Sequence, residues 1–170
     1  LKLMKKNADR LMRVINQLLD FRKIENNKMG LNISQVDLVS FTENVKSLFE
    51  DMAASKEITY EFTSEMPACK VWIDQDKMEK VLTNLLSNSF KFTPAGGKIG
   101  IHILEDAGKV FISVRDNGIG ISRDKIDKIF DRFYTEGTPS MGTGIGLHLT
   151  QEFIKMHHGQ IVVDSVPNEY

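Results

Sequence analysis

Residues 84–92 read Asn84-Leu-Leu-Ser-Asn88-Ser-Phe-Lys91-Phe92, and two further polar motifs come after them in fixed order. The second motif is Asp116-Asn-Gly118-Ile-Gly120, and the third is Gly142-Thr143-Gly144-Ile-Gly146-Leu147. Each motif alone is weak evidence. Together they supply an amide for a metal ion, a carboxylate for adenine and a glycine-rich turn for phosphate. They therefore predict a nucleotide site that is built without a Walker lysine loop.

The first motif is expected on a helix that begins after an N-cap at Asp74 or Asp76 and runs to about Phe90. At 100° per residue, Asn84, Asn88 and Lys91 fall within about 60° of one another. The opposite side is apolar and would enter the core: Met78, Val81, Leu82, Leu85 and Leu86. An amide oxygen is a hard ligand suited to Mg²⁺, and a lysine one turn further can meet phosphate charge. A solvated polar face is the alternative for this motif alone.

The second motif comes after a predicted strand whose Val110, Ile112 and Val114 point to one side. Its two glycines would let the backbone approach a planar ligand closely. Asp116 can accept a hydrogen bond from the exocyclic amine of adenine. Guanine presents a carbonyl at that place, so a buried carboxylate would reject it. An ordinary Asn-Gly hairpin turn is the alternative interpretation.

The third motif precedes an apolar helix. Backbone amides at a helix N-terminus bind anions, and the Thr143 hydroxyl adds a donor; a glycine-rich hinge is the alternative. The glycine spacing does not fit a Rossmann fingerprint, and no Walker A sequence occurs. The four histidines show no metal-ligand spacing with the single cysteine and are interpreted as structural: His102, His148, His157 and His158.

The bulk composition limits the function classes. A chain of 170 residues with net charge -1 fits one compact domain plus a short extra element, and gives no support to nucleic-acid or membrane-surface binding. Cys69 is the only cysteine, so an intrachain disulfide is impossible and a reducing compartment is expected. No apolar run approaches the roughly 20 residues that cross a bilayer, and no signal peptide is visible. The chain begins without Met inside a predicted helix, so we expect a fragment of a longer protein.

The first 25 residues predict a long helix with an a/d heptad seam at Leu1, Met4, Ala8, Leu11, Ile15 and Leu18. A helix this apolar needs a partner helix, although packing on its own domain is the alternative. Residues 26–30 then separate this helix from the rest of the chain.

The remaining pattern predicts an α+β fold, a two-layer sandwich in which helices cover one face of a mixed sheet. Asp37 is expected to cap a helix that extends to Met52. Further helices are expected over 124–130 and 144–157, and a mobile loop over 134–141. Strands are expected at 58–62, 71–73, 98–105, 109–116 and 160–165.

The order and content of these motifs resemble the sensor histidine kinases, within the Bergerat-type (GHKL) ATPase superfamily. Residues 84–92 resemble the N box, 116–120 the G1 box, 130–133 the F box and 142–147 the G2 box. Residues 1–25 resemble the second helix of the dimerisation and phosphotransfer hairpin. The resemblance implies a hairpin helix plus linker over 1–30 and a catalytic ATP-binding domain over 31–170 that lacks its final strand. The segment near Asp37 is most similar to hybrid two-component kinases of Bacteroides type.

The resemblance also implies site residues and cofactors, ATP and Mg²⁺. Asn88 is the implied metal ligand, Asn84 and Lys91 are the implied catalytic residues, and Phe133 anchors a lid over about 131–141. The implied nucleotide-binding set is Asn84, Asn88, Lys91, Phe92, Asp116, Gly118, Gly120, Ile121, Phe133, Gly142, Thr143, Gly144, Gly146 and Leu147.

Three departures from the family pattern stand out. Phe92 replaces a frequent tyrosine, Thr135 stands where many members carry a lid arginine, and the phospho-accepting histidine segment is absent from this chain. Asn84 occupies the place where related ATPases carry a glutamate that activates water, and an amide cannot take that proton. The sequence therefore predicts phosphoryl transfer to a histidine outside the chain, with slow or negligible hydrolysis.

The implied partners are a response-regulator receiver domain and a second copy, joined through the helix hairpin of the full-length protein. Binding to nucleic acid is not expected. Contact with a membrane is expected only through parts of the parent protein that are not present here. The location that the resemblance implies is cytoplasmic, as the cytoplasmic part of a membrane-anchored sensor. Two alternatives stay open: a non-catalytic dimerisation or nucleotide-sensing module, and an ATP-driven clamp, which Asn84 disfavours.

Overall fold

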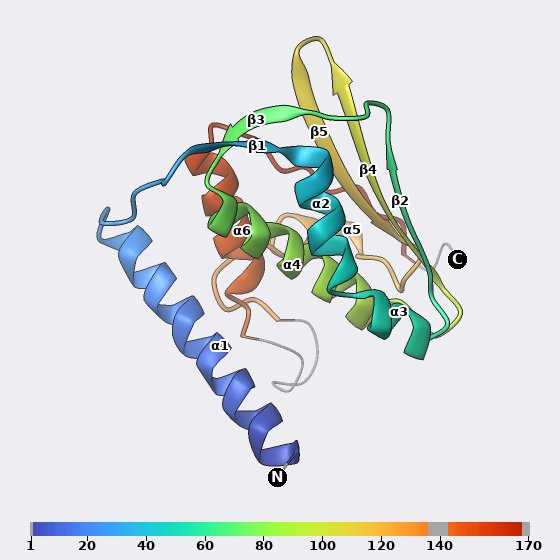
Figure 1. Cartoon of the computed structure of the whole chain (residues 1–170). Helices are drawn as coiled ribbons and strands as arrows, with labels where there is room; N and C mark the ends of the chain where they lie inside the picture. Colours follow the sequence, from blue (N-terminus) through green and yellow to red (C-terminus); the bar gives the residue numbers. More distant parts are fainter. Residues whose placement is uncertain (1, 136–142, 168–170) are drawn as a thin grey trace. The chain divides into compact units, whose positions relative to one another are not determined.

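The computed structural model describes residues 2–135 and 143–167 and has a mixed α/β fold (Figure 1). The chain forms two compact units. Unit 1 combines Leu1–Leu31 with Asp127–Ile161, and unit 2 combines Asn32–Ile126 with Val162–Tyr170. The helix at the start of the chain thus shares a unit with residues much later in the sequence. The division into functional domains at residue 30 stays a prediction.

The sheet of unit 2 is mixed, as the sequence predicts. β2 (Thr59–Ser64) pairs in parallel with β4 (Lys98–Asp106), and β4 pairs antiparallel with β5 (Lys109–Asp116). A separate two-stranded ribbon joins β1 (Ser34–Asp37) to β3 (Lys70–Ile73).

Alternation along the strands separates a core face from a polar face. Ile99, Ile101 and Ile103 of β4 are almost completely buried. The register places Tyr60 beside Ile99, and Val114 beside Ile101, so these partners share the core face. Asp116 pairs with Ile99 and therefore ends β5 on that same face.

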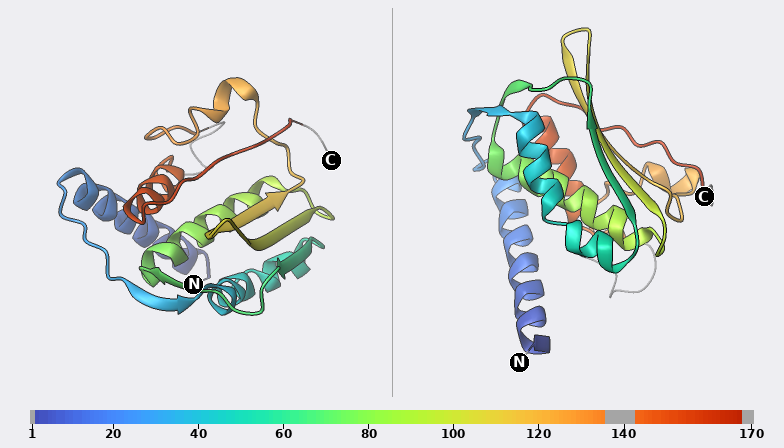
Figure 2. Two further views of the ribbon diagram at one scale, coloured as in Figure 1. Left: turned by 90° about the horizontal axis from the view of Figure 1, so that it is seen from above. Right: turned by 45° about the vertical axis from the view of Figure 1, so that its right-hand side comes forward.

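Three helices of unit 2 lie on one side of this sheet (Figure 2): α2 (Leu38–Ser47), α3 (Glu50–Ser55) and α4 (Gln75–Phe92). The Phe90 ring of α4 stacks on Phe49 at 5.4 Å between centroids and meets Tyr60 edge-on at 5.0 Å. These aromatic contacts fix the C-terminal end of α4, the end that carries the first polar motif.

Unit 1 contains α1 (Lys2–Glu25), which contacts α6 (Gly146–Met156). The side of α1 that bears Phe21 is buried, whereas Met4, Leu11, Ile15 and Leu18 of the heptad seam are exposed. The packed stripe fits the alternative interpretation, and pairing of the seam with a partner helix stays a prediction. One stripe packs within the chain, and the predicted seam remains on the surface.

Several element predictions are wrong in detail. The helix expected over 38–52 is interrupted, because Phe49 leaves helical geometry (φ -111°, ψ 1°) where its ring enters the aromatic stack. The helix expected over 124–130 shortens to α5 (Arg123–Ile126), and β1 was not expected. Residues 160–165 form no strand in the described part of the chain. Most of the loop expected over 134–141 lies outside the described residues, as does Gly142.

Candidate functional site

Asp74, rather than Asp76, is the N-cap of α4. Its carboxylate accepts from the Lys77 backbone N–H at 3.1 Å, the Lys77 ammonium at 2.6 Å and the Asn32 N–H at 2.7 Å. Burial raises the pKa of this carboxyl, but these charged and backbone donors outweigh burial and hold the pKa at about 2. Asp74 thus fixes both the start of α4 and the chain that enters unit 2.

The predicted polar column lies along α4. Asn84 and Asn88 are half-buried and Lys91 is exposed, whereas Leu82 and Leu86 of the other side are fully buried. The Lys91 ammonium lies 4.4 Å from the centroid of the Phe92 ring, and partial burial lowers its pKa. The helix therefore divides into a core side and an amide-bearing side, as its sequence period predicts.

The loop over residues 116–121, which follows β5, is hydrogen-bonded to the end of α4 and to the start of β4. The Ile119 N–H donates to the Phe92 carbonyl at 3.3 Å. Asn117 donates its N–H to the Lys98 carbonyl at 3.2 Å, and its side-chain oxygen accepts from the Lys98 N–H at 2.6 Å. Unit 2 therefore brings the first and second motifs together. The anchoring role of Asn117 was not predicted, although the residue lies inside the motif.

The structure gives a reason for glycine at two positions of this loop that the sequence did not reveal. A Cβ at Gly118 would lie 2.7 Å from the Phe92 carbonyl oxygen. Gly120 has φ +67° and lies against the backbone of Val166 and Pro167. The sequence alone suggested that these glycines allow close approach of a ligand. In the structure, the protein's own backbone makes the close approach that requires glycine.

Asp116 ends β5 with an exposed side chain, and its carboxylate accepts from the Gly118 N–H at 3.0 Å. Rejection of guanine was expected from a buried carboxylate. In the structure water reaches Asp116, so discrimination between bases requires the bound base itself to shield the group. Ile121, the last residue of the loop, is half-buried.

In unit 1 the F box and the glycine-rich turn lie together. Phe133 donates its N–H to the Gly144 carbonyl at 3.0 Å and adopts φ +62°. Gly144 has φ +67°, and a Cβ there would lie 2.5 Å from the Phe133 carbonyl carbon. A residue with a side chain at position 144 would therefore clash with the backbone of the F box, so glycine is needed there.

The first turn of α6 comes directly after this glycine-rich turn. Its N-cap, Ile145, provides no side-chain hydrogen bond, and the first turn, which contains Gly146 and Leu147, has no acidic residue. By contrast, α2 and α4 are capped by Asp37 and Asp74. The start of α6 therefore has the electrostatic character that suits an anion.

A stripe of α1 contacts these two motifs within unit 1. Gln17 accepts from the Thr143 hydroxyl at 2.9 Å, and Glu25 pairs with Arg132 at 2.9 Å. The Phe21 and Phe133 rings meet edge-on, with 6.2 Å between their centroids. The Arg132 guanidinium lies 5.0 Å from the centroid of the Phe21 ring. Gln17, Phe21 and Glu25 are spaced by four, so they lie on one face of the helix.

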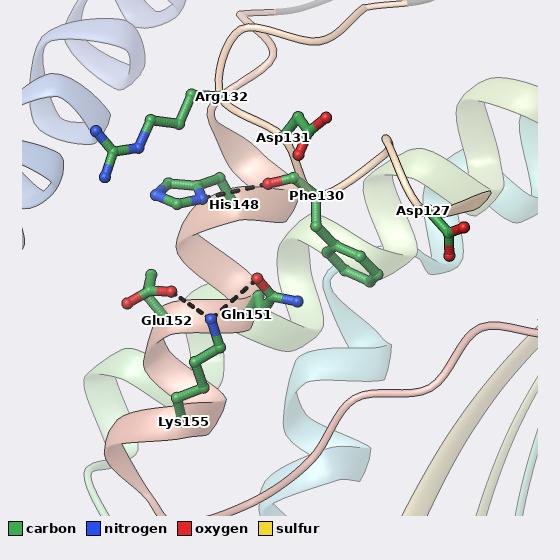
Figure 3. A pocket seen from close by; sticks show the side chains of 8 residues that line it. All are labelled: Asp127, Phe130, Asp131, Arg132, His148, Gln151, Glu152 and Lys155. Carbon is green, nitrogen blue, oxygen red and sulfur yellow. Dashed lines mark hydrogen bonds and ion pairs between the residues drawn. The ribbon is translucent and has the colours of Figure 1, made fainter. Parts of the chain in front are cut away.

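A polar hollow in unit 1 is lined by F-box residues and by α6 (Figure 3). There Lys155 contacts Glu152 at 2.8 Å and Gln151 at 3.2 Å, and His148 Nδ1 lies 3.2 Å from the Phe130 carbonyl oxygen. None of the residues predicted to bind nucleotide lines this hollow. It is therefore not the predicted nucleotide site.

The histidines make local contacts. His102 lies 2.8 Å from the Thr63 hydroxyl, and His157 Nδ1 lies 2.7 Å from the Phe153 carbonyl oxygen. Within residues 2–135 and 143–167, no group of three or more His, Cys, Asp or Glu side chains could hold a metal ion. Over the same residues, no helix combines the length and apolar character needed to span a bilayer.

Residues 73–169 match the model of the family described as histidine kinase-, DNA gyrase B- and HSP90-like ATPases. The chain belongs to this ATPase family. The match begins just before α4 and includes all four boxes, so ATP is the nucleotide to which this domain is suited.

Relatives of known name and structure narrow the comparison to histidine kinases. The sensor histidine kinase TmoS of Ectopseudomonas mendocina is 39% identical over 95% of this chain and 17% of its own length. The catalytic domain of histidine kinase ThkA is 30% identical, with a TM-score of 0.69 over 74% of this chain and 81% of that one. ThkA in complex with the response regulator TrrA gives a TM-score of 0.71 at 25% identity, over 89% of this chain and 43% of that one.

The chain matches the catalytic ATP-binding domain of histidine kinases, with the mixed α/β fold that the resemblance implied. It spans only 11% to 17% of the length of the first three curated relatives. The roles of individual site residues remain predictions.

Proposed function

We propose that this chain binds Mg-ATP and supplies the γ-phosphoryl group to a histidine that lies outside it, as part of a two-component phosphorelay. In this transfer the bond between the γ-phosphorus and the bridging oxygen breaks and a phosphorus–nitrogen bond forms. ADP leaves, and the imidazole loses its N–H proton. The observation that carries the proposal is the family match across the boxes, together with the amide at Asn84.

The residues of unit 2 are suited to the base and the metal. Asn88 presents an amide oxygen on the half-buried side of α4, and one protein oxygen plus phosphate and water is a typical Mg²⁺ environment. Bound Mg²⁺ would neutralise charge on the phosphates. Lys91 would add positive charge one turn further along the helix, and Asp116 would accept from the adenine amine.

The residues of unit 1 are suited to the phosphates. The first turn of α6 offers backbone amides without a side-chain cap. The Thr143 hydroxyl donates to Gln17 in this structure and would have to turn from Gln17 to donate to a phosphate. Gly144 and Gly146 add no side chains to this turn. Phe133 would anchor the lid from the F box.

Asn84 favours transfer over hydrolysis. A side-chain amide has no basic nitrogen with which to take a proton from water. Asn84 therefore positions groups without serving as a general base, and hydrolysis without a protein acceptor should be slow.

The partners that we propose are a receiver domain and a second copy of the parent protein. ThkA, one of the structural neighbours, has been solved with a response regulator. The heptad seam of α1 is exposed at Leu11, Ile15 and Leu18, which suits it to a hairpin bundle. We place the domain in the cytoplasm, where ATP is available.

Isothermal titration with ATP and GTP in the presence of Mg²⁺ tests the nucleotide assignment. ATP should bind, and GTP should bind much more weakly, because guanine presents a carbonyl to Asp116. Equal affinity for the two nucleotides would contradict the role of Asp116. Omission of Mg²⁺ should weaken the binding of ATP more in the wild type than in Asn88→Ala.

A further inference from the structure

Residues 162–167, here called the strap, lie against the far end of the 116–121 loop in unit 2. The Ile121 N–H donates to Ser165 Oγ at 2.8 Å. A Cβ on Gly120 would collide with the Val166 carbonyl oxygen and would lie 2.9 Å from the Pro167 Cα. The strap thus contacts two consecutive loop residues, although more than forty positions separate the two segments in the sequence.

The loop has anchors at three places. Asn117 is held by Lys98 of β4, and Ile119 is held by the Phe92 carbonyl of α4. The third anchor, at Ile121, is the Ser165 hydroxyl. The first two anchors come from regular elements of the core, whereas the third comes from an irregular segment. The far end of the loop is therefore held by one side-chain hydrogen bond, from Ser165, and by backbone packing at Gly120.

We propose that Ser165 is a positioning residue for the nucleotide: by holding Ile121, it fixes the part of the 116–121 loop that follows Asp116 in the position that receives the adenine base. This inference rests on the proposed function, because it takes Asp116 as the adenine contact. Ser165 acts through the loop backbone and does not itself touch the base. Hence its loss changes binding at the base end and leaves phosphate contacts intact.

The way in which the strap contacts the loop supports this role. The alternation over 160–165 predicted a strand, yet the described residues show none there. Strand pairing would have used backbone carbonyls spread over several residues. Instead, a hydroxyl accepts from one loop amide, and the backbone at Val166 closes against a glycine with positive φ. The hydrogen bond of this contact can be removed by a single substitution without disturbing the ladder between β4 and β5.

The test replaces Ser165 by Ala and measures the Kd of adenosine, AMP, ADP and ATP by titration calorimetry. Loss of one net hydrogen bond corresponds to about a fivefold rise in Kd. The rise should be the same for all four ligands, because the change lies at the base end. Ser165→Thr keeps the hydroxyl and should restore binding. Ser113→Ala makes the same change at an exposed position of β5 and should leave every Kd unchanged.

Amide hydrogen exchange without ligand supplies a second readout. Ser165→Ala should speed exchange at Ile121 while the amides of β4 keep their protection. An unchanged Kd for the variant, or a loss that grows with the number of phosphates, would overturn the inference. If the wild type bound no adenine nucleotide, the proposed function itself would fail. The two failures are distinguished by the wild-type titration alone.

Discussion

A single buried carboxylate, Asp74, joins the start of α4 to the chain that enters unit 2. The residue is only 2% exposed, and its carboxylate accepts hydrogen bonds from Lys77 and from the Asn32 backbone. Its pKa is lowered from 3.8 to about 2. Because the folded pKa lies below the unfolded value, the stabilisation is complete well above pH 4 and is lost as the pH falls through about 2.

Asp74→Asn keeps a good N-cap and removes this titration. Between pH 5 and pH 2, the free energy of unfolding of the wild type should fall by about 2 kcal/mol more than that of the variant. Urea unfolding at a series of pH values measures this. Asp76→Asn, at an exposed carboxylate in the same helical turn, serves as the control and should behave like the wild type. Parallel pH profiles for wild type and Asp74→Asn would contradict the assignment.

Asp116 carries the prediction for base recognition. Asp116→Asn removes the charge that strengthens the hydrogen bond to the adenine amine, so the Kd of ATP should rise about tenfold or more. The amide oxygen can still accept from the Gly118 N–H, so the unfolding midpoint should stay close to that of the wild type. Asp106→Asn, at the other end of the hairpin, should leave the Kd unchanged. Wild-type affinity in Asp116→Asn would refute this role.

Individual residues were predictable to different degrees. The side of α4 that carries Asn84 and Asn88 is predictable from helical period alone. The reasons for Gly118 and Gly120 were not, because they depend on backbone from Phe92 and Val166, which the sequence places elsewhere. Ser165 carries no local signal at all. Its partner is known only once the chain has folded.

At the scale of elements, Phe21 is the centre of the contact between α1 and the F box. The ring is 8% exposed and meets Phe133, His148 and Arg132. Phe21→Ala should lower the free energy of unfolding by about 3 kcal/mol, because it removes a buried aromatic side chain. Leu19→Ala truncates an apolar residue of the same helix that is 53% exposed, and should cost much less. Denaturant unfolding compares the two variants, and equal losses would show that this face of α1 is not packed.

The elements themselves were largely predictable where periodicity is strong. Alternation and helical period predict the β4–β5 hairpin and α4, and Asp37 caps α2 as expected. Errors arose where tertiary contacts override local pattern. Phe49 breaks a predicted helix because its ring stacks on Phe90, and β1 forms because a partner strand, β3, is available.

At the scale of the whole molecule, the exposed seam of α1 predicts self-association. Leu11, Ile15 and Leu18 are 61%, 41% and 41% exposed, and burial of such a stripe against a second copy is favourable. Sedimentation velocity should show a concentration-dependent shift toward a dimer. Replacement of all three residues by Ser should abolish the shift while the circular dichroism spectrum stays unchanged. A clean wild-type monomer at high concentration would count against association through this seam.

We propose that this domain delivers phosphate to a histidine. The most direct test joins the chain to the hairpin helix that carries the accepting histidine and incubates the product with ATP labelled at the γ-phosphate. We predict protein-bound label that is labile to acid and stable to alkali, and that falls about tenfold in Asp116→Asn when the ATP concentration is below the Kd. Acid-stable label would indicate transfer to a serine or threonine, and ATP hydrolysis without protein label would indicate an ATPase. Either result would contradict the account.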